Sequence, residues 1–241
     1  MQQDHRKDFY TALEKIKTSD SFAISRYADG EASVLKNITI GNKDGWLYKK
    51  DKNLIFRSDL RKSLTCVDKN FVYGISSPNV DEKNYLFLKK LIQQNLSYIT
   101  FSDIWVNANY DLFTELFFST LNDTKKQIII VTNPKANIGK LKEFLNIKEL
   151  IPVKGNGVQY WEKNRNYLKA LLDLKASLNE HMIFLVAAGP LSNIIIYEMW
   201  QINRHNTYLD IGSTLDPILF NRQSRSYHQA DHPHRKFVDK W

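Results

Sequence analysis

The sequence offers little for a disulfide framework, a membrane span or a secretory leader. Cysteine occurs once in 241 residues, at Cys66, so an internal disulfide and a cysteine-rich zinc site are both excluded. The longest apolar runs, 128–131 and 182–188, are far too short to cross a bilayer. The N-terminal residues lack the apolar segment of a signal peptide. These absences predict a cytoplasmic protein in which Cys66 is a small buried residue.

Several well-known catalytic motifs are missing as well. The sequence contains neither a Walker loop nor the Gly-x-Gly-x-x-Gly fingerprint of dinucleotide-binding proteins. It also lacks the Gly-x-Ser-x-Gly elbow of the α/β-hydrolases. The segment Leu-Asp-Ile-Gly at 209–212 is similar to the first motif of methyltransferases, but it lies near the end of the chain and continues into Ser-Thr-Leu-Asp-Pro. The sequence therefore argues against all these classes of enzyme.

Basic residues outnumber acidic ones by 34 to 26, which gives a formal net charge of +8. The lysines are spread over many segments, and the densest basic cluster lies in the C-terminal tail, residues 222–241. Scattered lysines are typical of a solvated surface rather than of a groove that follows a nucleic-acid backbone. The charge therefore does not favour nucleic acid as a partner, and it leaves open a phosphate-bearing small molecule.

Short runs rich in β-branched and aromatic residues alternate with segments of helical periodicity. The runs predict strands at 22–25, 71–75, 98–101, 128–132, 150–153, 183–187 and 208–211. The periodic segments predict helices at 5–18, 81–95, 109–121, 136–146, 159–178 and 191–204. Since strands separated by helices pair in parallel, we expect a single α/β domain over 1–241, with a Rossmann-like, doubly wound, mainly parallel sheet and helices on both faces. Residues 37–53 interrupt this pattern and predict a mobile loop.

Ligands of such sheets bind beyond the carboxyl ends of the strands. Small and polar residues follow nearly every predicted strand, at 26–31, 76–79, 102–105, 133–134, 154–157, 188–190 and 212–214. Asn107, Asn133 and Asn156 lie after strands or in loops, where their amides can bind sugar hydroxyls, although asparagine is also common in turns. The sequence thus predicts a site along this edge of the sheet.

The first of these segments carries two carboxylates. Asp29 and Glu31 flank Gly30, which permits a sharp turn that aims both side chains at one point. Hard cations such as Mg²⁺ and Mn²⁺ prefer oxygen ligands of this kind, together with substrate phosphates. Arg26, three residues before Asp29, offers a planar fork to a phosphate. From spacing alone, an ordinary Asp-Gly turn at a helix start remains the simpler explanation.

Two further segments follow predicted strands near the C-terminus. Gly189 and Pro190 join a strand to a helix, where free backbone amides suit an anion, although a tight turn explains the same residues equally well. Asp210 ends a strand and is a candidate base, outer partner of a metal or ribose ligand. Ser213 and Asp216 follow it, either as substrate contacts or as caps of a turn.

Taken in order, three segments resemble the motifs of a known family. Arg-Tyr-Ala-Asp-Gly-Glu at 26–31, Gly-Pro at 189–190 and Asp-Ile-Gly at 210–212 are similar to those of the bacterial glycosyltransferases of the GT-D fold. This family was once catalogued as a domain of unknown function, and its founding member glucosylates a serine-rich adhesin glycan. The resemblance spans nearly the whole chain. Ala28 replaces the family's usual glycine, and Ser213 stands where many relatives have histidine.

The resemblance implies a hexosyltransferase that takes a sugar from a nucleotide-diphosphate donor, typically a uridine diphosphate sugar, to a glycan or glycoprotein acceptor of the cell surface. It implies that Asp29 and Glu31 form the Asp-x-Glu motif that binds Mn²⁺ or Mg²⁺. Glu31 and Asp210 would be the catalytic residues, and Arg26 and Gly189 would position the diphosphate. A non-catalytic module that binds a nucleotide or a glycan is the alternative.

The sequence leaves open whether the chain forms a homo-oligomer. Large apolar residues around Trp105 and at 117–118 are candidates for a subunit contact. They fit an ordinary hydrophobic core equally well, so the sequence alone does not choose between the two.

Overall fold

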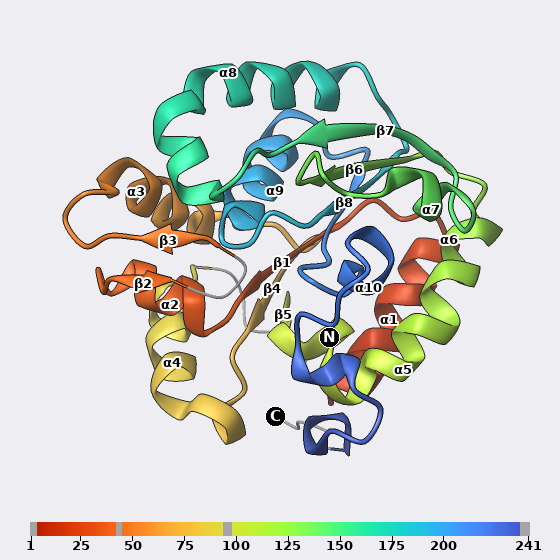
Figure 1. The fold of residues 1–241 in the computed structure, drawn as a ribbon, viewed down its shortest axis with the longest axis horizontal. Coiled ribbons are helices and arrows are strands. Elements are labelled where there is room, and N and C mark those ends of the chain that lie inside the picture. Colours follow the sequence, from red (N-terminus) through yellow and green to blue (C-terminus); the bar gives the residue numbers. More distant parts are fainter. Residues whose placement is uncertain (1–3, 42–44, 94–97, 237–241) are drawn as a thin grey trace.

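A computed structural model describes residues 4–41, 45–93 and 98–236, and within these ranges seven strands form one sheet (Figure 1). The strands are β1 (Ala23–Tyr27), β4 (Phe71–Ile75), β5 (Ile99–Phe101), β6 (Ile128–Thr132), β7 (Ile147–Pro152), β8 (Ile183–Val186) and β9 (Thr207–Asp210). Their order across the sheet is β5-β4-β1-β9-β8-β6-β7, and every neighbouring pair is parallel. The Rossmann-like α/β fold class predicted from the sequence is confirmed.

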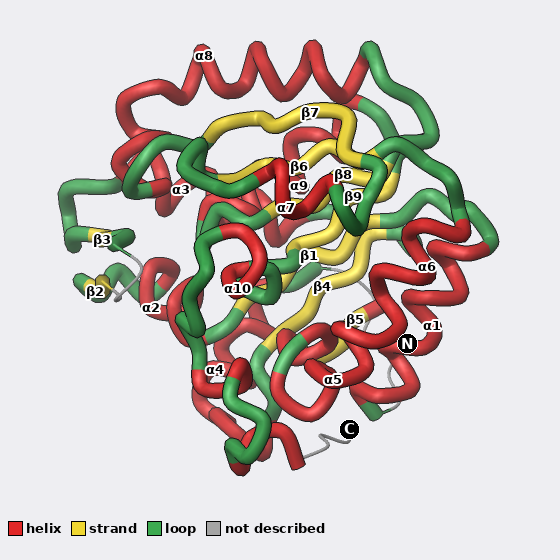
Figure 2. Tube along the Cα trace, turned by 45° about the vertical axis from the view of Figure 1, so that its right-hand side comes forward, coloured by secondary structure: helices red, strands yellow, loops and turns green. Residues whose placement is uncertain are grey.

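Helices cover both faces of this sheet (Figure 2). One face carries α2 (Asp29–Leu35), α3 (Leu54–Lys62), α4 (Pro78–Leu91), α8 (Gly157–Ser177) and α9 (Leu191–Ile202). The other carries α1 (His5–Lys17), α5 (Tyr110–Leu112), α6 (Phe118–Asp123), α7 (Ile138–Lys142) and α10 (Asp216–Leu219). A π-helical turn at Phe113–Phe117 joins α5 to α6. Short 3₁₀ turns lie at Ser63–Thr65, Ser102–Trp105, Asn107–Asn109, Ser226–His228 and Pro233–Lys236.

Because both faces are covered, the strands β4, β6, β8 and β9 are buried along their whole length, whereas the edge strand β7 carries the exposed Lys148. Successive side chains of a strand point to opposite faces. In β1, Ala23 therefore packs in the core beneath α8 and α9, whereas Ile24 packs in the core beneath α1 and α6. This two-sided burial holds β1, which leads directly into the 26–31 segment, at the centre of the sheet.

The first and last strands of the sheet are neighbours. The chain winds outward from β1 through β4 to β5, and the strands from β6 onward fill the other half until β9 returns to the centre. There β9 pairs with β1, and Ala23 lies opposite Tyr208. Their carboxyl ends form a topological switch point, the place where open α/β sheets bind ligands.

The predicted loop at 37–53 contains regular structure. The strands β2 (Ile40–Gly41) and β3 (Leu47–Tyr48) form a small antiparallel hairpin, and α3, which the sequence analysis did not predict, follows it. Residues 42–44 lie outside the described residues, and the mobility of the loop stays a prediction. The predicted helix at 81–95 begins earlier, at Pro78, because Ser77 caps it and proline suits a first helical turn. Its last residues, 94–95, also lie outside the described residues.

The basic tail folds back onto the domain. Arg235 donates from Nη1 to Asp111 and from Nε to the carbonyl of Tyr227, both at 2.7 Å, and its guanidinium lies over the ring of Tyr110. Residues 237–241 of the predicted tail lie outside the described residues. Up to residue 236, the tail is thus part of the folded domain.

Of the two alternatives for the large apolar residues around Trp105 and at 117–118, the structure favours the core for Trp105 and Phe117, and oligomerisation stays a prediction. Trp105 and Phe117 are fully buried and pack against each other with ring centroids 5.4 Å apart. They fill the core between the sheet and α1, so the hydrophobic effect acts on them within one chain. None of the described helices combines the length and the apolarity that a membrane span requires.

Candidate functional site

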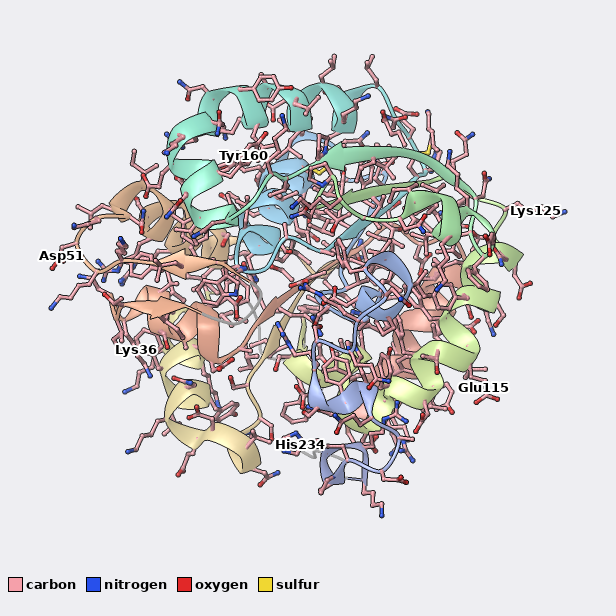
Figure 3. The ribbon with its side chains drawn as sticks, in the orientation of Figure 1. Lys36, Asp51, Glu115, Lys125, Tyr160 and His234 are labelled. Atoms are coloured by element: carbon pink, nitrogen blue, oxygen red, sulfur yellow. The ribbon has the colours of Figure 1, made fainter. Side chains whose placement is uncertain are left out.

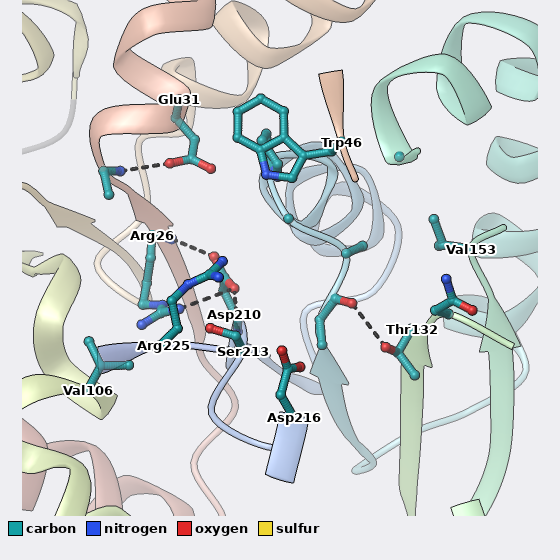
Figure 4. A pocket seen from close by; sticks show the side chains of 18 of the residues that line it. Arg26, Glu31, Trp46, Val106, Thr132, Val153, Asp210, Ser213, Asp216 and Arg225 are labelled. Atoms are coloured by element: carbon teal, nitrogen blue, oxygen red, sulfur yellow. Dashed lines mark hydrogen bonds and ion pairs between the residues drawn. The ribbon is translucent and has the colours of Figure 1, made fainter. Parts of the chain in front are cut away.

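A cavity of about 430 Å³ opens at the carboxyl edge of the sheet, around the switch point between β1 and β9 (Figure 4). Residues that follow β1, β5, β6, β7, β8 and β9 contribute to its lining. The charged residues of the lining are Arg26, Asp29, Glu31, Asp103, Lys135, Asp210, Asp216, Arg222 and Arg225. Because both signs of charge are present, the cavity can accommodate an anionic ligand together with a cation.

Arg26 and Asp210 form the floor of this cavity. Asp210 accepts the main-chain N–H of Arg26 at 3.2 Å and that of Gly212 at 3.0 Å. The guanidinium of Arg26 lies 3.9 Å from the same carboxylate, and the two side chains are only 12% and 7% exposed. Burial raises the pKa of Asp210, while the Arg26 guanidinium opposes that rise. The floor is therefore a buried pair of opposite charges, in which backbone N–H groups hold the carboxylate in place.

Gly212 makes room for the Arg26 guanidinium. Its φ is +52°, and a Cβ at this position would overlap with Nη2 of Arg26. On the other side, Nη1 of Arg26 donates to the carbonyl of Ser102 at 3.0 Å. Within the described residues, Nε of Arg26 is buried without a hydrogen-bond partner. A buried N–H group is costly to leave without a hydrogen-bond partner. The Nε of Arg26 is such an unused donor at the bottom of a charged cavity.

Glu31 lies at the start of α2, beside the floor. Its Oε2 accepts the main-chain N–H of Ala28 at 2.9 Å. Burial, together with the nearby carboxylates of Asp210 and Asp29, raises the pKa of Glu31 to about 7, although its backbone hydrogen bonds oppose the rise. This part of the cavity thus holds an excess of negative charge that a bound cation would relieve.

Asp29 and Glu31 fit a divalent cation in part. Both line the cavity, and carboxylate oxygens are the ligands that Mg²⁺ and Mn²⁺ prefer. In the part of the chain that the structure describes, no group of three or more His, Cys, Asp or Glu side chains is placed to hold a metal ion. A cation here would therefore take its remaining ligands from water and from substrate phosphates, as Mg²⁺ commonly does.

Sequence reasoning missed Trp46, whose indole forms one wall of the cavity (Figure 4). The residue precedes β3 in the hairpin and packs against the glycines of two separate turns. A Cβ on Gly30 would lie 3.1 Å from Cζ2 of Trp46, and one on Gly189 would lie 3.5 Å from its Cδ1. The small size of these two glycines lets the ring lie close to the strand ends.

The C-terminal segment supplies another wall. The hydroxyl of Tyr227 hydrogen-bonds to that of Ser213 at 2.7 Å, and Nε2 of His228 lies 3.1 Å from the Ser213 carbonyl. Arg222 pairs with Asp216 at 3.5 Å. Ser213 and Asp216 are therefore held by the tail, which the sequence analysis treated only as a basic cluster.

The predicted site residues divide into two groups. The cavity is lined by Arg26, Asp29, Glu31, Asn133, Gly189, Asp210, Ser213 and Asp216. Gly30, Asn107 and Asn156 are not among the lining residues. The Asn156 side chain instead caps α8 by accepting the N–H of Val158 at 3.0 Å, and Asn107 donates to Asp103 at 2.6 Å. Local hydrogen bonding of this kind is the common role of asparagine at turns and helix starts.

The structure is that of a Rossmann-like α/β protein with a charged cavity at the carboxyl edge of its sheet. A selenomethionine-substituted structure of domain of unknown function 1792 is similar, with a TM-score of 0.60 and 17% identity over 97% of this chain and 89% of that chain. A second structure of this domain, described as having a distinct glycosyltransferase fold, gives a TM-score of 0.57 and 15% identity over the same shares. No protein-family model and no curated protein matches the chain. The chain therefore has a glycosyltransferase-like fold, and the resemblance to the GT-D family is confirmed at the level of fold.

Proposed function

We propose that the chain is a metal-dependent glycosyltransferase that moves a sugar from a nucleotide-diphosphate donor, such as a uridine diphosphate sugar, to a glycan or glycoprotein acceptor of the cell surface. One observation carries the proposal. The cavity at the β1/β9 switch point is lined by the carboxylates of Asp29 and Glu31 and by the buried guanidinium of Arg26. The chain that carries it is similar in fold to a structure described as having a distinct glycosyltransferase fold. A diphosphate with a bound cation matches this combination of charges.

Asp29 and Glu31 would hold Mn²⁺ or Mg²⁺, which when bound neutralises negative charge on the donor diphosphate and on the leaving nucleotide. Arg26 would supply a fixed positive charge beneath the diphosphate, since Ser102 and Asp210 already hold its guanidinium in place. Asp210 accepts two main-chain N–H groups and faces Arg26, which supports a role in orienting that guanidinium rather than a role as base.

Trp46 would contact the uncharged part of the donor. Its half-buried indole lines the cavity beside the Gly189 turn, at the entrance to α9. Aromatic side chains stack on flat bases and on the apolar faces of sugars, so this wall suits either ring of a nucleotide sugar. The cavity would then separate its tasks, with charged groups at the floor and an aromatic surface on one side.

The activity can be tested by incubating the purified protein with a panel of nucleotide sugars and Mn²⁺ and measuring release of the nucleotide. We expect release with at least one donor, and we expect a chelator to abolish it. Asp29→Asn and Glu31→Gln should lower the rate by about a hundredfold or more, because each removes a charged ligand of the cation. Glu82→Gln, an exposed carboxylate on α4, is the matched control and should leave the rate unchanged. Full activity of both cavity variants at saturating Mn²⁺ would contradict the metal assignment.

A non-catalytic binding module is the second candidate, and the absence of a third protein ligand among the described residues favours it. Calorimetry of uridine diphosphate separates the two. Binding that strengthens strongly with Mn²⁺ supports the enzyme, whereas metal-independent binding without turnover of any donor supports the module.

A further inference from the structure

Helix α8 carries a row of large apolar side chains that face water. Tyr167, Leu174 and Leu178 are 64%, 52% and 72% exposed, and Leu171 lies between them with its side chain partly buried. Their spacing of four, three and four residues places all four on one stripe of the helix and its C-cap. Figure 1 shows α8 along the outer edge of the molecule, and Figure 3 shows its side chains projecting from that edge. We call these four residues the α8 stripe.

The spacing of the α8 stripe, four, three and four residues, is the same in both directions along the helix. When two copies of α8 pack antiparallel, Leu171 lies opposite Leu174 of the second copy, and Tyr167 lies opposite Leu178. Each apolar side chain thus meets another, and one surface patch serves both copies. Such a self-complementary patch is what a two-fold dimer requires.

The surroundings of the stripe favour the antiparallel arrangement. Exposed Lys163 lies just before the kink at Asn164, and exposed Glu180 lies two residues beyond the C-cap Leu178, so antiparallel packing places opposite charges near both ends of the contact. Parallel packing would place like charges side by side. Antiparallel helices also bring opposite ends of the two helix dipoles together. On the open side of the stripe, the small side chains of Ala170 and Ser177 allow close approach of a second helix.

Charges on the inner side of α8 are already used within the chain. Lys169 is paired with Glu198 of α9, and Lys175 is paired with Glu149 of β7. These pairs hold α8 to the domain and leave the apolar side chains as the main feature of its outer surface. A second copy of this chain can therefore cover the stripe without breaking an existing ion pair.

We propose that the α8 stripe is a homodimer interface, in which two copies pack α8 antiparallel about a two-fold axis between Leu171 and Leu174. The interface does not depend on the proposed glycosyltransferase activity. Gly157, at the start of α8, borders the cavity, but the stripe lies further along the helix and contributes no lining residue.

The interface can be tested by sedimentation equilibrium of the full chain. We expect a dimer, and we expect Leu174→Glu to raise its dissociation constant about tenfold or more, because it buries a charge at the centre of the contact. Val67→Glu is the control, since Val67 is 67% exposed and lies elsewhere, and it should leave the constant unchanged. Circular dichroism checks that both variants fold. A wild-type chain that is monomeric at about 100 μM, or a dimer that survives Leu174→Glu, would overturn the proposal.

Cross-linking of introduced cysteines tests the orientation. In the antiparallel dimer, residue 174 is offset from its own copy by about 4.5 Å along the helix, whereas residue 178 is offset by about 16 Å. A thiol cross-linker with a span of about 8 Å, close to the separation of packed helix axes, should therefore join Leu174→Cys but not Leu178→Cys. Native Cys66 is buried and does not compete. Equal cross-linking of the two variants would indicate a parallel dimer and contradict the proposed geometry.

Discussion

The floor and the rim of the cavity are built differently. On the floor, the side chains of Arg26 and Asp210 are buried; Asp210 accepts two main-chain N–H groups, and Arg26 donates to the carbonyl of Ser102. At the rim, Asp29 and Lys135 are exposed, and Trp46 is half-buried in a hairpin. A buried charge pair has a fixed geometry before any ligand arrives, whereas exposed charges are screened and free to reorient. Changes in the floor should therefore act mainly on the stability of the protein, and changes at the rim mainly on the binding of ligands.

The largest effect is expected for Asp210→Asn. It leaves the buried Arg26 guanidinium without its counter-charge, and breaking a buried pair in this way commonly costs about 3 kcal/mol or more. Urea denaturation followed by circular dichroism measures the loss. Asp216→Asn is the matched control, because Asp216 is also buried but its partner Arg222 is 48% exposed, and we expect a loss of about 1 kcal/mol. Equal losses of stability in the two variants would show that the buried Arg26–Asp210 pair contributes no more than the Arg222–Asp216 pair.

Glu31, between floor and rim, should make stability depend on pH. Its pKa is raised to about 7 in the folded chain from an ordinary value of 4.5, so the folded state keeps a proton that the unfolded state releases. The metal-free protein should therefore lose stability as the pH rises from about 4.5 to 7, by up to about 3 kcal/mol. Glu31→Gln cannot lose that proton, so it should be more stable than wild type at pH 8 and nearly equal to it at pH 4.5. Parallel pH profiles of the two proteins would contradict this account.

Trp46→Ala should separate binding from stability. Stacking of one base on an aromatic side chain contributes about 1 to 3 kcal/mol, so we expect the affinity for a nucleotide diphosphate to fall about tenfold. Trp46→Phe keeps an aromatic surface and should retain most of the affinity. Calorimetric titration with uridine diphosphate and Mn²⁺ measures both. If Trp46→Ala binds the nucleotide with unchanged affinity, Trp46 does not contact the donor.

Gly212→Ala should disturb the floor through a single methyl group. The new Cβ overlaps with the Arg26 guanidinium, and alanine is strained at a φ of +52°. We expect a loss of stability of about 1 to 2 kcal/mol. Gly155→Ala is the matched control, because Gly155 has a similar φ of +62° but open space where its Cβ would lie. Thermal denaturation measures the stability of both variants. The difference between their losses is the free-energy cost of displacing the Arg26 guanidinium.

Much of the fold could be predicted because the physics behind it is local. Buried strands are short apolar runs, and the polar residues that follow them mark the carboxyl edge of a parallel sheet. The adjacency of β1 and β9 could not be predicted in the same way, since their pairing joins residues such as Ala23 and Tyr208, which are far apart in sequence. Without that pairing, nothing in the sequence places Asp210 beside Arg26.

The site was predicted less completely than the fold. Trp46 was missed because its place in the wall depends on the hairpin folding over Gly30 and Gly189, and no local pattern reports that contact. The position of Asn156 after a strand predicts a sugar contact, but its side chain satisfies the backbone at the start of α8. Polar residues that complete local hydrogen bonds and polar residues that bind ligands look alike in a sequence.

Asp29→Asn is expected to have the smallest effect on the free energy of unfolding, within about 0.5 kcal/mol, because Asp29 is exposed. It should nevertheless remove most of the thermal stabilisation that Mn²⁺ gives the wild-type chain, since a cation bound only by the folded state shifts the unfolding equilibrium. Thermal denaturation with and without Mn²⁺ measures both quantities. Asp51→Asn, an exposed carboxylate beyond the hairpin, is the control and should keep the metal response. A large loss of stability without metal would show that Asp29 belongs with the buried residues of the floor. An unchanged stabilisation by Mn²⁺ would show that Glu31 and its neighbours bind the cation without Asp29.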